Sequence, residues 1–234
     1  MNERRSTESI SFPLGENGSA DAYFVEYMSA LAETVKLIEC SSINSVVSVL
    51  RKVIAGKGLI YVAGNGGSAA ITNHLNCDFS KGISTDTSVF PRIFPLAAEV
   101  SLLTAIGNDI SYDDVFSYQL SVYARPGDVL LTVSSSGNSE NVVRAAKWAQ
   151  NNGLPIIAFT GFEGGRSAES ATVNLHVSAD NYGVVEDTHQ SLMHILAQYI
   201  RLAAMPASLI SERTAILFNT GLLMWLVDQR AVVT

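Results

Sequence analysis

The spacing of hydrophobic positions changes near residue 58 of this chain. From Ala22 to about Ala55, apolar residues recur at the three- and four-residue intervals of amphipathic helices. We expect two helices there, joined near Ser41 and Ser42. After them come short runs rich in β-branched residues and bounded by turn residues, which are typical of buried strands. These runs are GLIYVAG, DVLLTVS, LPIIAFTG and TVNLHVS, with RIFPLA as a weaker fifth strand.

Helical stretches separate the predicted strands. They begin near Gly67, Glu99, Asp113, Asn138 and Gly165. Strand and helix therefore alternate from Leu59 to Val177, which is the pattern of a parallel sheet covered by helices on both faces. The expected fold class is α/β, a doubly wound parallel sheet sandwich preceded by the N-terminal helical pair. A long C-terminal helix should follow, from about Val184 to Met205.

The length of 234 residues suits one compact domain with a sizeable core. We expect a flexible, polar N-terminal lead-in over residues 1–20, a single domain over 21–205 and a C-terminal extension over 206–234. The lead-in lacks the apolar core of a signal peptide. The late apolar run from Ala215 to Val227 is too short to span a bilayer, so we interpret it as a packed helix or an oligomer contact.

Charge and cysteine content narrow the range of partners. Fifteen basic against 22 acidic side chains give a net charge of -7, which repels phosphate backbones and argues against nucleic acid as a partner. An anionic substrate must then be held by local donors such as backbone N–H groups. The two cysteines, Cys40 and Cys77, form no CxxC pair, which predicts ordinary buried thiols and a reduced, cytoplasmic compartment. Because the longest late apolar run is too short to span a bilayer, we expect no membrane partner.

The first candidate ligand loop follows the strand LIYVA. Ligands of open parallel sheets bind beyond the carboxyl ends of the strands. Here Gly66 and Gly67 let the backbone approach a ligand, while Asn65 and Ser68 offer side-chain hydrogen bonds. A dinucleotide loop is the alternative interpretation. It is disfavoured because the third glycine of GxGxxG is missing in register and Asp86 does not end a strand.

The second candidate loop follows the strand DVLLTV and leads into a predicted helix. It carries four hydroxyl groups, on Ser134, Ser135, Ser136 and Ser139. A helix N-terminus supplies unpaired N–H groups and a partial positive charge, so this loop can bind a phosphate without lysine. A serine-rich helix cap is the alternative, but a cap needs a single hydroxyl.

Two helical pairs supply titratable groups. His74 and Asp78 lie four residues apart and therefore on one helix face. Glu186 and His194 lie eight residues apart on the last helix, with Gln190 between them. A lone helical histidine is more often a core or surface residue than a ligand. The four side chains together form a stronger candidate site.

These motifs resemble the SIS-domain phosphoheptose isomerase family. The resemblance rests on GNGGSAAITNHLNCDF, EVSLLTAIGNDISYDDVFSYQL, SSSGNSENVVRAA, AFTGFEGG and YGVVEDTHQSLMHILAQ. It implies a homotetramer with shared active sites, and phosphate held by the four serines of the second loop. It also implies that Asn65 and Ser68 contact the sugar and that Glu99 is an acidic residue near the substrate.

The resemblance further implies an activity and a metal. The activity is isomerisation of sedoheptulose 7-phosphate to D-glycero-D-manno-heptose 7-phosphate through an enediol. The metal is a divalent ion, usually zinc, at the positions of His74, Asp78, Glu186 and His194. We assign Asp78 as the base at carbon and His194 as the acid/base at the oxygens.

Two positions depart from the family pattern. The usual glutamate base is replaced by Asp78, one methylene shorter, and the usual glutamine ligand is replaced by Glu186, which adds negative charge. The alternative function is a non-catalytic SIS module that binds a phosphosugar or a protein, of the kind that associates with a replication initiator. The two histidines and two carboxylates at the site positions favour the enzyme.

Overall fold

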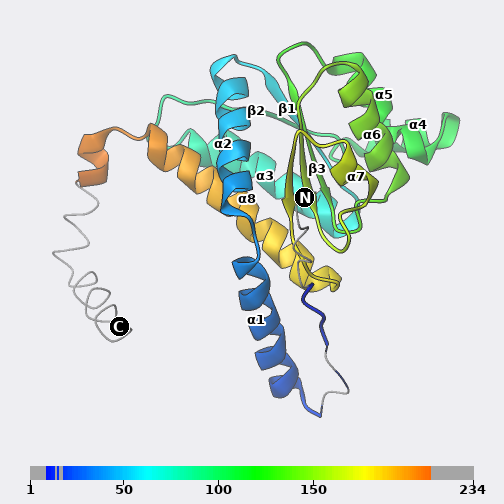
Figure 1. The fold of residues 1–234 in the computed structure, drawn as a ribbon. Coiled ribbons are helices and arrows are strands. Elements are labelled where there is room, and N and C mark those ends of the chain that lie inside the picture. Colours follow the sequence, from blue (N-terminus) through cyan, green and yellow to red (C-terminus); the bar gives the residue numbers. More distant parts are fainter. Residues whose placement is uncertain (1–8, 14, 16–17, 212–234) are drawn as a thin grey trace, which may run out of the picture.

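The computed structural model describes residues 9–13, 15 and 18–211. Its elements are α1 (Ala20–Lys36), α2 (Cys40–Ala55), β1 (Leu59–Ala63), α3 (Gly66–Cys77), the π-helical segment η1 (Asp78–Ile83), β2 (Arg92–Pro95), α4 (Val100–Asp109), the 3-10 segment η2 (Tyr112–Asp114), α5 (Val115–Tyr123), β3 (Val129–Ser134), α6 (Glu140–Asn151), β4 (Ile156–Thr160), α7 (Gly165–Glu169), β5 (Val173–His176) and α8 (Tyr182–Ala204). The strands form one parallel sheet in the order β2-β1-β3-β4-β5 (Figure 1). The predicted α/β class and the weak fifth strand are confirmed.

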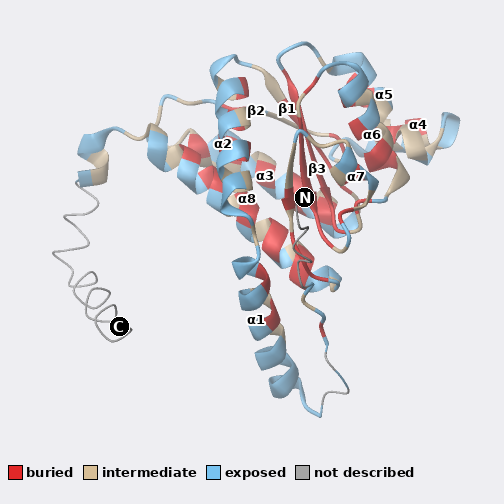
Figure 2. Cartoon of the chain, in the orientation of Figure 1, coloured by how far each residue is buried: buried red, intermediate tan, exposed pale blue. Residues whose placement is uncertain are grey.

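The central strands are buried on both faces, which explains why they appear in the sequence as continuous apolar runs. Every residue of β3 is buried. Leu131 and Val133 belong to the core beneath α2, α3 and α8, whereas Leu130 packs in the core beneath α4, α5 and α6. Because successive side chains of a strand point to opposite faces, one short run supplies both cores. Figure 2 shows the resulting buried centre between two helical layers.

Two expectations about the first helices need correction. The break between them lies at residues 37–39, where Leu37 ends α1, so Ser41 and Ser42 belong to the first turn of α2. Cys40 and Cys77 are exposed free thiols and not buried ones. Each lies on the solvent side of an amphipathic helix whose other face packs on the sheet.

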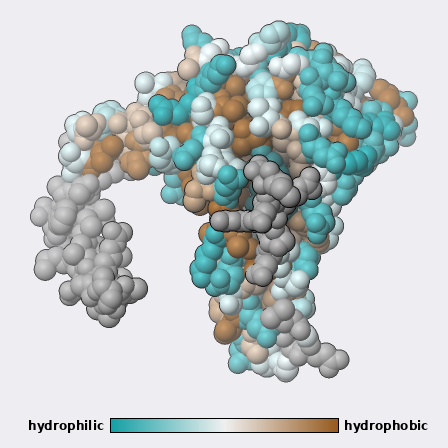
Figure 3. Space-filling view, viewed as in Figure 1, coloured by the Kyte–Doolittle hydropathy of each residue, from teal (hydrophilic) through white to brown (hydrophobic). Residues whose placement is uncertain are grey.

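Helix α1 projects from the body of the domain (Figure 1). It packs against α8 through one side, while Phe24, Val25 and Met28 stay exposed. Figure 3 shows apolar residues among the polar ones on this projecting part. A single chain therefore leaves an apolar surface on α1 in contact with water.

The predicted run from Ala215 to Val227 lies outside the described residues. Among the residues that are described, none of the helices has the length and apolar character that crossing a bilayer requires.

Of the two histidines on α8, His189 is the one that points into the core, and it is completely buried. Its Nε2 lies 3.2 Å from the carbonyl oxygen of Thr160, and its ring packs against Phe159. Its Nδ1 has no hydrogen-bond partner among the described residues. Burial disfavours the charged imidazolium and lowers the pKa of His189 to about 4.

This buried histidine makes stability depend on pH. Between pH 6.5 and about 4 the unfolded chain binds a proton at this position and the folded chain does not, so stability falls as the pH is lowered. At pH 5 the loss from this group should be about 2 kcal/mol. We expect His189→Gln to reduce the pH dependence by about that amount, measured by urea unfolding at pH 7.5 and pH 5 with a chelator present. Equal losses in parent and variant would contradict this assignment.

Candidate active site

The first loop joins β1 to α3 through residues 64 and 65. Asn65 occupies the N-cap position, but its side chain makes no capping hydrogen bond. The Asn65 amide donates to Asn141 Oδ1 at 2.8 Å, and its oxygen accepts from Asn141 Nδ2 at 3.0 Å and from the Tyr112 hydroxyl at 3.0 Å. Gly66 has a φ of +53°, which an L side chain rarely adopts. The first turn of α3 is thus tied to the first turn of α6.

Gly67 allows α3 to approach α8 closely. A Cβ atom at this position would clash with the carboxylate of Glu186. The side chain of Glu186 is partly buried against this backbone, and burial raises its pKa, with a further contribution from the charge of Asp187. Gly67 therefore sets the spacing between α3 and α8.

The serine loop lies at the carboxyl end of β3, beside the first loop. Ser134 Oγ accepts a hydrogen bond from Gly137 N at 3.2 Å, and Ser136 Oγ accepts one from Asn138 N at 3.3 Å. Ser139 holds the N-cap position of α6 without a capping hydrogen bond. The Ser135 hydroxyl is buried and has no partner among the described residues. Buried hydroxyls normally have a partner, so Ser135 is available to a ligand.

A cavity of about 250 Å³ brings both loops together. It is lined by Asn65, Gly66, Gly67, Ser68, Val133, Ser134, Ser135, Ser136, Ser139, Tyr182 and Glu186. All the residues expected in the two loops line it, together with Glu186 from the last helix. Its donors are hydroxyl and amide groups, which suit an anion more than an apolar ligand.

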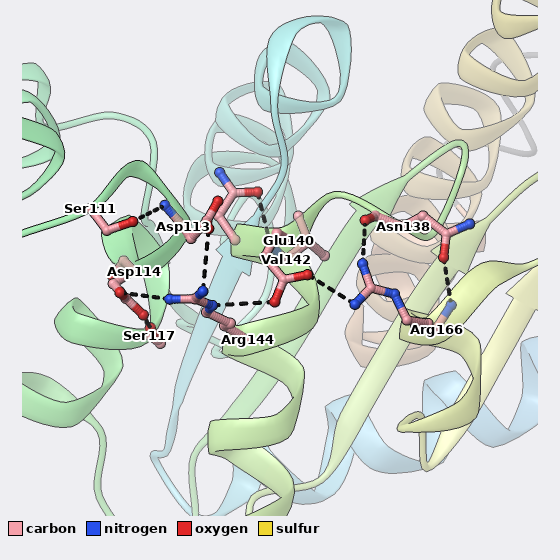
Figure 4. Close-up of polar contacts among 10 residues, drawn as sticks. Ser111, Asp113, Asp114, Ser117, Asn138, Glu140, Val142, Arg144 and Arg166 are labelled. Carbon is pink, nitrogen blue, oxygen red and sulfur yellow. Dashed lines mark hydrogen bonds and ion pairs between the residues drawn. The ribbon is translucent and has the colours of Figure 1, made fainter.

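A chain of ion pairs holds the serine loop and α6 in place (Figure 4). The Arg166 guanidinium donates to the carbonyl oxygen of Asn138 at 2.9 Å and to Glu140 at 2.9 Å. Arg144 donates to Glu140 at 3.2 Å and to Asp114 at 2.8 Å. Hydrogen bonds from Arg166 and then Arg144 lower the pKa of Glu140. The carboxylate of Glu140, in the first turn of α6, is therefore paired with two guanidinium groups.

A second group of side chains lies further along α3 and α8. Asp78 Oδ2 accepts from His194 Nδ1 at 2.6 Å, and Asp78 Oδ1 lies 3.5 Å from His74 Nε2. The two imidazole rings meet edge to face with centroids 4.8 Å apart. Gln190 places its amide nitrogen 3.0 Å from His74 Nδ1 and 2.9 Å from His194 Nε2.

One ligand atom from each of His74, Asp78 and His194 lies within 4.8 Å of the others. Two imidazole nitrogens and a carboxylate oxygen match the donors of a catalytic zinc site, which has three protein ligands and an open position. The side chains of all three residues are partly exposed, so an ion and a substrate both have access. The donor set present therefore fits a divalent metal.

Glu186 and Glu99 do not join this group. Glu186 faces Gly67 and the serine loop, two helical turns before His194, and its role as a metal ligand stays a prediction. Glu99 caps α4 by accepting hydrogen bonds from the backbone and hydroxyl of Ser101, and it does not line the cavity. The role of Glu99 near the substrate likewise stays a prediction.

Four residues of the site were not assigned a role from the sequence. Asn141 and Tyr112 fix Asn65, Tyr182 lines the cavity, and Gln190 contacts both histidines. Gln190 and Tyr182 carried a usable signal, because they lie four residues before His194 and Glu186 and so on the same faces of the last helix. Asn141 and Tyr112 approach Asn65 from elements that are distant from it in the sequence.

This chain is similar in sequence to a known domain family and to several known proteins. A model of the SIS domain matches residues 23–161. The chain is 33% identical to a probable phosphoheptose isomerase of Thermoplasma volcanium over 175 residues, which are 75% of this chain and 89% of that protein. It is 38% identical to the phosphoheptose isomerase of Mycobacterium tuberculosis over 149 residues, 62% of this chain and 73% of that one.

Solved structures give the same result. The phosphoheptose isomerase of Neisseria gonorrhoeae is 33% identical and superposes with a TM-score of 0.70, covering 77% of this chain and 95% of that one. The phosphoheptose isomerase of Francisella tularensis is 25% identical with a TM-score of 0.72, over 78% of this chain and 96% of that one. This chain therefore belongs to the SIS-domain family of phosphoheptose isomerases.

Proposed function

We propose that this chain isomerises sedoheptulose 7-phosphate to D-glycero-D-manno-heptose 7-phosphate through an enediol. The observation that supports the proposal best is the arrangement of α3 and α8. Gly67 meets Glu186 at the cavity, and His74 meets His194 further along the same two helices. Seven residues of α3 correspond to about 10 Å. An anion-binding cavity and an acid/base group are thus separated by roughly the length of a sugar phosphate.

In this proposal the serine loop binds the phosphate group. The hydroxyls of Ser134, Ser135, Ser136 and Ser139 and the N-terminus of α6 supply the hydrogen bonds. Donors fixed by the backbone suit a chain of net charge -7, because they act locally where the overall field repels an anion. Binding energy from the remote phosphate would position the reacting carbons.

Asn65, Ser68 and Glu186 would contact the sugar. Burial raises the pKa of Glu186, so its carboxyl becomes protonated at a higher pH than an exposed glutamate does. A protonated carboxyl can donate a hydrogen bond to a hydroxyl or phosphate oxygen. The Asn65 amide is held by Asn141, so its orientation is fixed before a substrate binds. A preorganised contact of this kind reduces the entropic cost of binding.

Proton transfer is assigned to Asp78 and His194. Asp78 would remove the proton from the carbon beside the carbonyl, and His194 would move a proton between the two oxygens. Their 2.6 Å hydrogen bond orients both groups toward one region. Asp78 is one methylene shorter than glutamate and reaches less far, and it lies on η1, which packs against α8.

We propose zinc as the metal of this centre. His74, Asp78 and His194 would hold it, since nitrogen and oxygen donors of this kind suit zinc. A bound ion would supply Lewis-acid polarisation of the substrate carbonyl. Glu186 is retained as a further proposed ligand, which would require its side chain to turn from Gly67 toward the histidines.

We further propose a homotetramer with shared active sites. The exposed apolar residues of α1 offer a surface for a second chain. Contact with a neighbouring chain would also give Glu99 a route to the substrate, because it lies outside the cavity of its own chain. The free thiols of Cys40 and Cys77 suit a reducing compartment, and we propose a cytoplasmic location.

The activity is tested directly with purified protein and sedoheptulose 7-phosphate. We expect aldose formation, followed by NMR, that falls after chelation and returns with zinc. Conversion that is unaffected by chelation would remove the metal from the proposal. No conversion under any condition would contradict the isomerase and favour a binding module or another sugar phosphate, which a panel of ketose phosphates would distinguish.

Removing the base should abolish turnover. We expect Asp78→Asn and His194→Ala each to lower kcat by about 100-fold or more, as loss of a general acid or base usually does. Asp21→Asn changes an exposed carboxylate on α1 in the same way and should stay within about twofold of the parent. Turnover of Asp78→Asn within a few fold of the parent would show that another group is the base.

Removal of the unpaired Ser135 hydroxyl should weaken phosphate binding. We expect Ser135→Ala to weaken inhibition by inorganic phosphate and to raise KM by about 10-fold or more, the effect of one hydrogen bond to a charged group. Ser167→Ala is the matched control, because its hydroxyl is also buried and unpaired in the described chain but does not line the cavity. Equal inhibition constants for Ser135→Ala and the parent would place the phosphate elsewhere.

A further inference from the structure

Gln190 lies on α8 between the cavity and the histidine pair, and its side chain is half-buried. Its amide nitrogen contacts one nitrogen of each imidazole, at 3.0 Å from His74 Nδ1 and 2.9 Å from His194 Nε2. Asp78 contacts the other nitrogen of each ring. The two rings are therefore held between a carboxylate on one side and a carboxamide on the other.

The hydrogen bonds fix where the protons lie when no metal is bound. A carboxylate can only accept, so His194 must donate its Nδ1 proton to Asp78. A neutral imidazole carries one proton, which leaves Nε2 of His194 as an acceptor. The amide group of Gln190 has two protons and can donate one to His194 and one to His74. Both amide protons of Gln190 and the Nδ1 proton of His194 then have acceptors, and the Nε2 proton of His74 is on the side of Asp78, whose Oδ1 lies 3.5 Å from that nitrogen.

A bound metal would exchange the donor and acceptor nitrogens of each imidazole ring. An ion held by Asp78 would take the lone pair of the ring nitrogen that faces Asp78, in each histidine. The single proton of each ring would then move to the opposite nitrogen, which faces Gln190. Metal-binding histidines almost always donate that outer N–H to an acceptor, which fixes the ring orientation.

We propose that Gln190 is the shared orienting residue of the metal centre, and that it serves both states by exchanging its amide nitrogen for its oxygen. Rotation of the carboxamide by about 180° replaces Nε2 with Oε1 at nearly the same place, because the two halves of the group are almost equal in shape. The oxygen has two lone pairs and accepts from both outer N–H groups. The inference rests on the proposed metal centre.

Gln190 is a positioning residue in this scheme and not a ligand. It faces the nitrogens of His74 and His194 that point away from Asp78, so an ion bound on the Asp78 side lies beyond its reach. It is also uncharged, and it can orient the rings without competing for the ion. Glutamate would accept as well as glutamine in the metal-bound state, but it could not donate in the metal-free state.

The test measures zinc affinity by competition with a chromophoric chelator, with unfolding curves to verify that each variant is folded. We expect Gln190→Leu to bind zinc about 10- to 100-fold more weakly, the usual effect of removing an outer-shell partner. Gln190→Glu keeps the acceptor and should bind within about threefold of the parent or more tightly. Gln198→Leu makes the same change at an exposed position of α8 and should leave the affinity within about twofold.

A folded Gln190→Leu protein with parental zinc affinity would overturn the inference. Equal weakening in the Leu and Glu variants would overturn it too, because an acceptor would then not be what the rings require. A parent protein that binds no zinc would refute both the metal centre and this role of Gln190. The isomerase assay on sedoheptulose 7-phosphate is independent of that result and would still decide the activity.

Discussion

The packing of α3 against α8 is the contact on which both halves of the candidate site depend. Gly67 lets the first turn of α3 approach Glu186, and this spacing continues along the helices until His74 meets His194. Both helices also bury their apolar sides in the core beneath the sheet. The same contact that stabilises the fold thus places the cavity and the pair of histidines along the same two helices.

Local donors would let an acidic chain bind an acidic ligand. The cavity contains hydroxyls, backbone N–H groups and the N-terminus of α6, whereas Arg144 and Arg166 pair with carboxylates and loop carbonyls. In the proposed function the arginines hold the loop in shape, and the loop supplies the hydrogen bonds to the phosphate. Such a division would make the affinity for the ligand depend more on loop geometry than on long-range attraction, and so would reduce its sensitivity to salt.

Under the proposed role of Gln190, the histidine group accepts two protonation patterns. Asp78 accepts only, the imidazoles donate at one nitrogen and accept at the other, and Gln190 can do both. Partly exposed side chains tolerate such a change because water can satisfy a group during the exchange. His189 precedes Gln190 in the chain but lies about 100° away around the axis of α8, where it is buried in the core and its pKa is lowered to about 4.

The sequence by itself determined the α/β class, the strand positions, the two ligand loops and the two helical pairs of titratable residues. These features are local, since they follow from side-chain period, from glycine and serine positions and from spacing on one helix. The sequence alone did not reveal the exposure of Cys40 and Cys77, the separation of Glu186 from the histidines, or the contacts that fix Asn65. Those depend on how distant elements rotate and pack against each other, and only the tertiary structure sets that rotation.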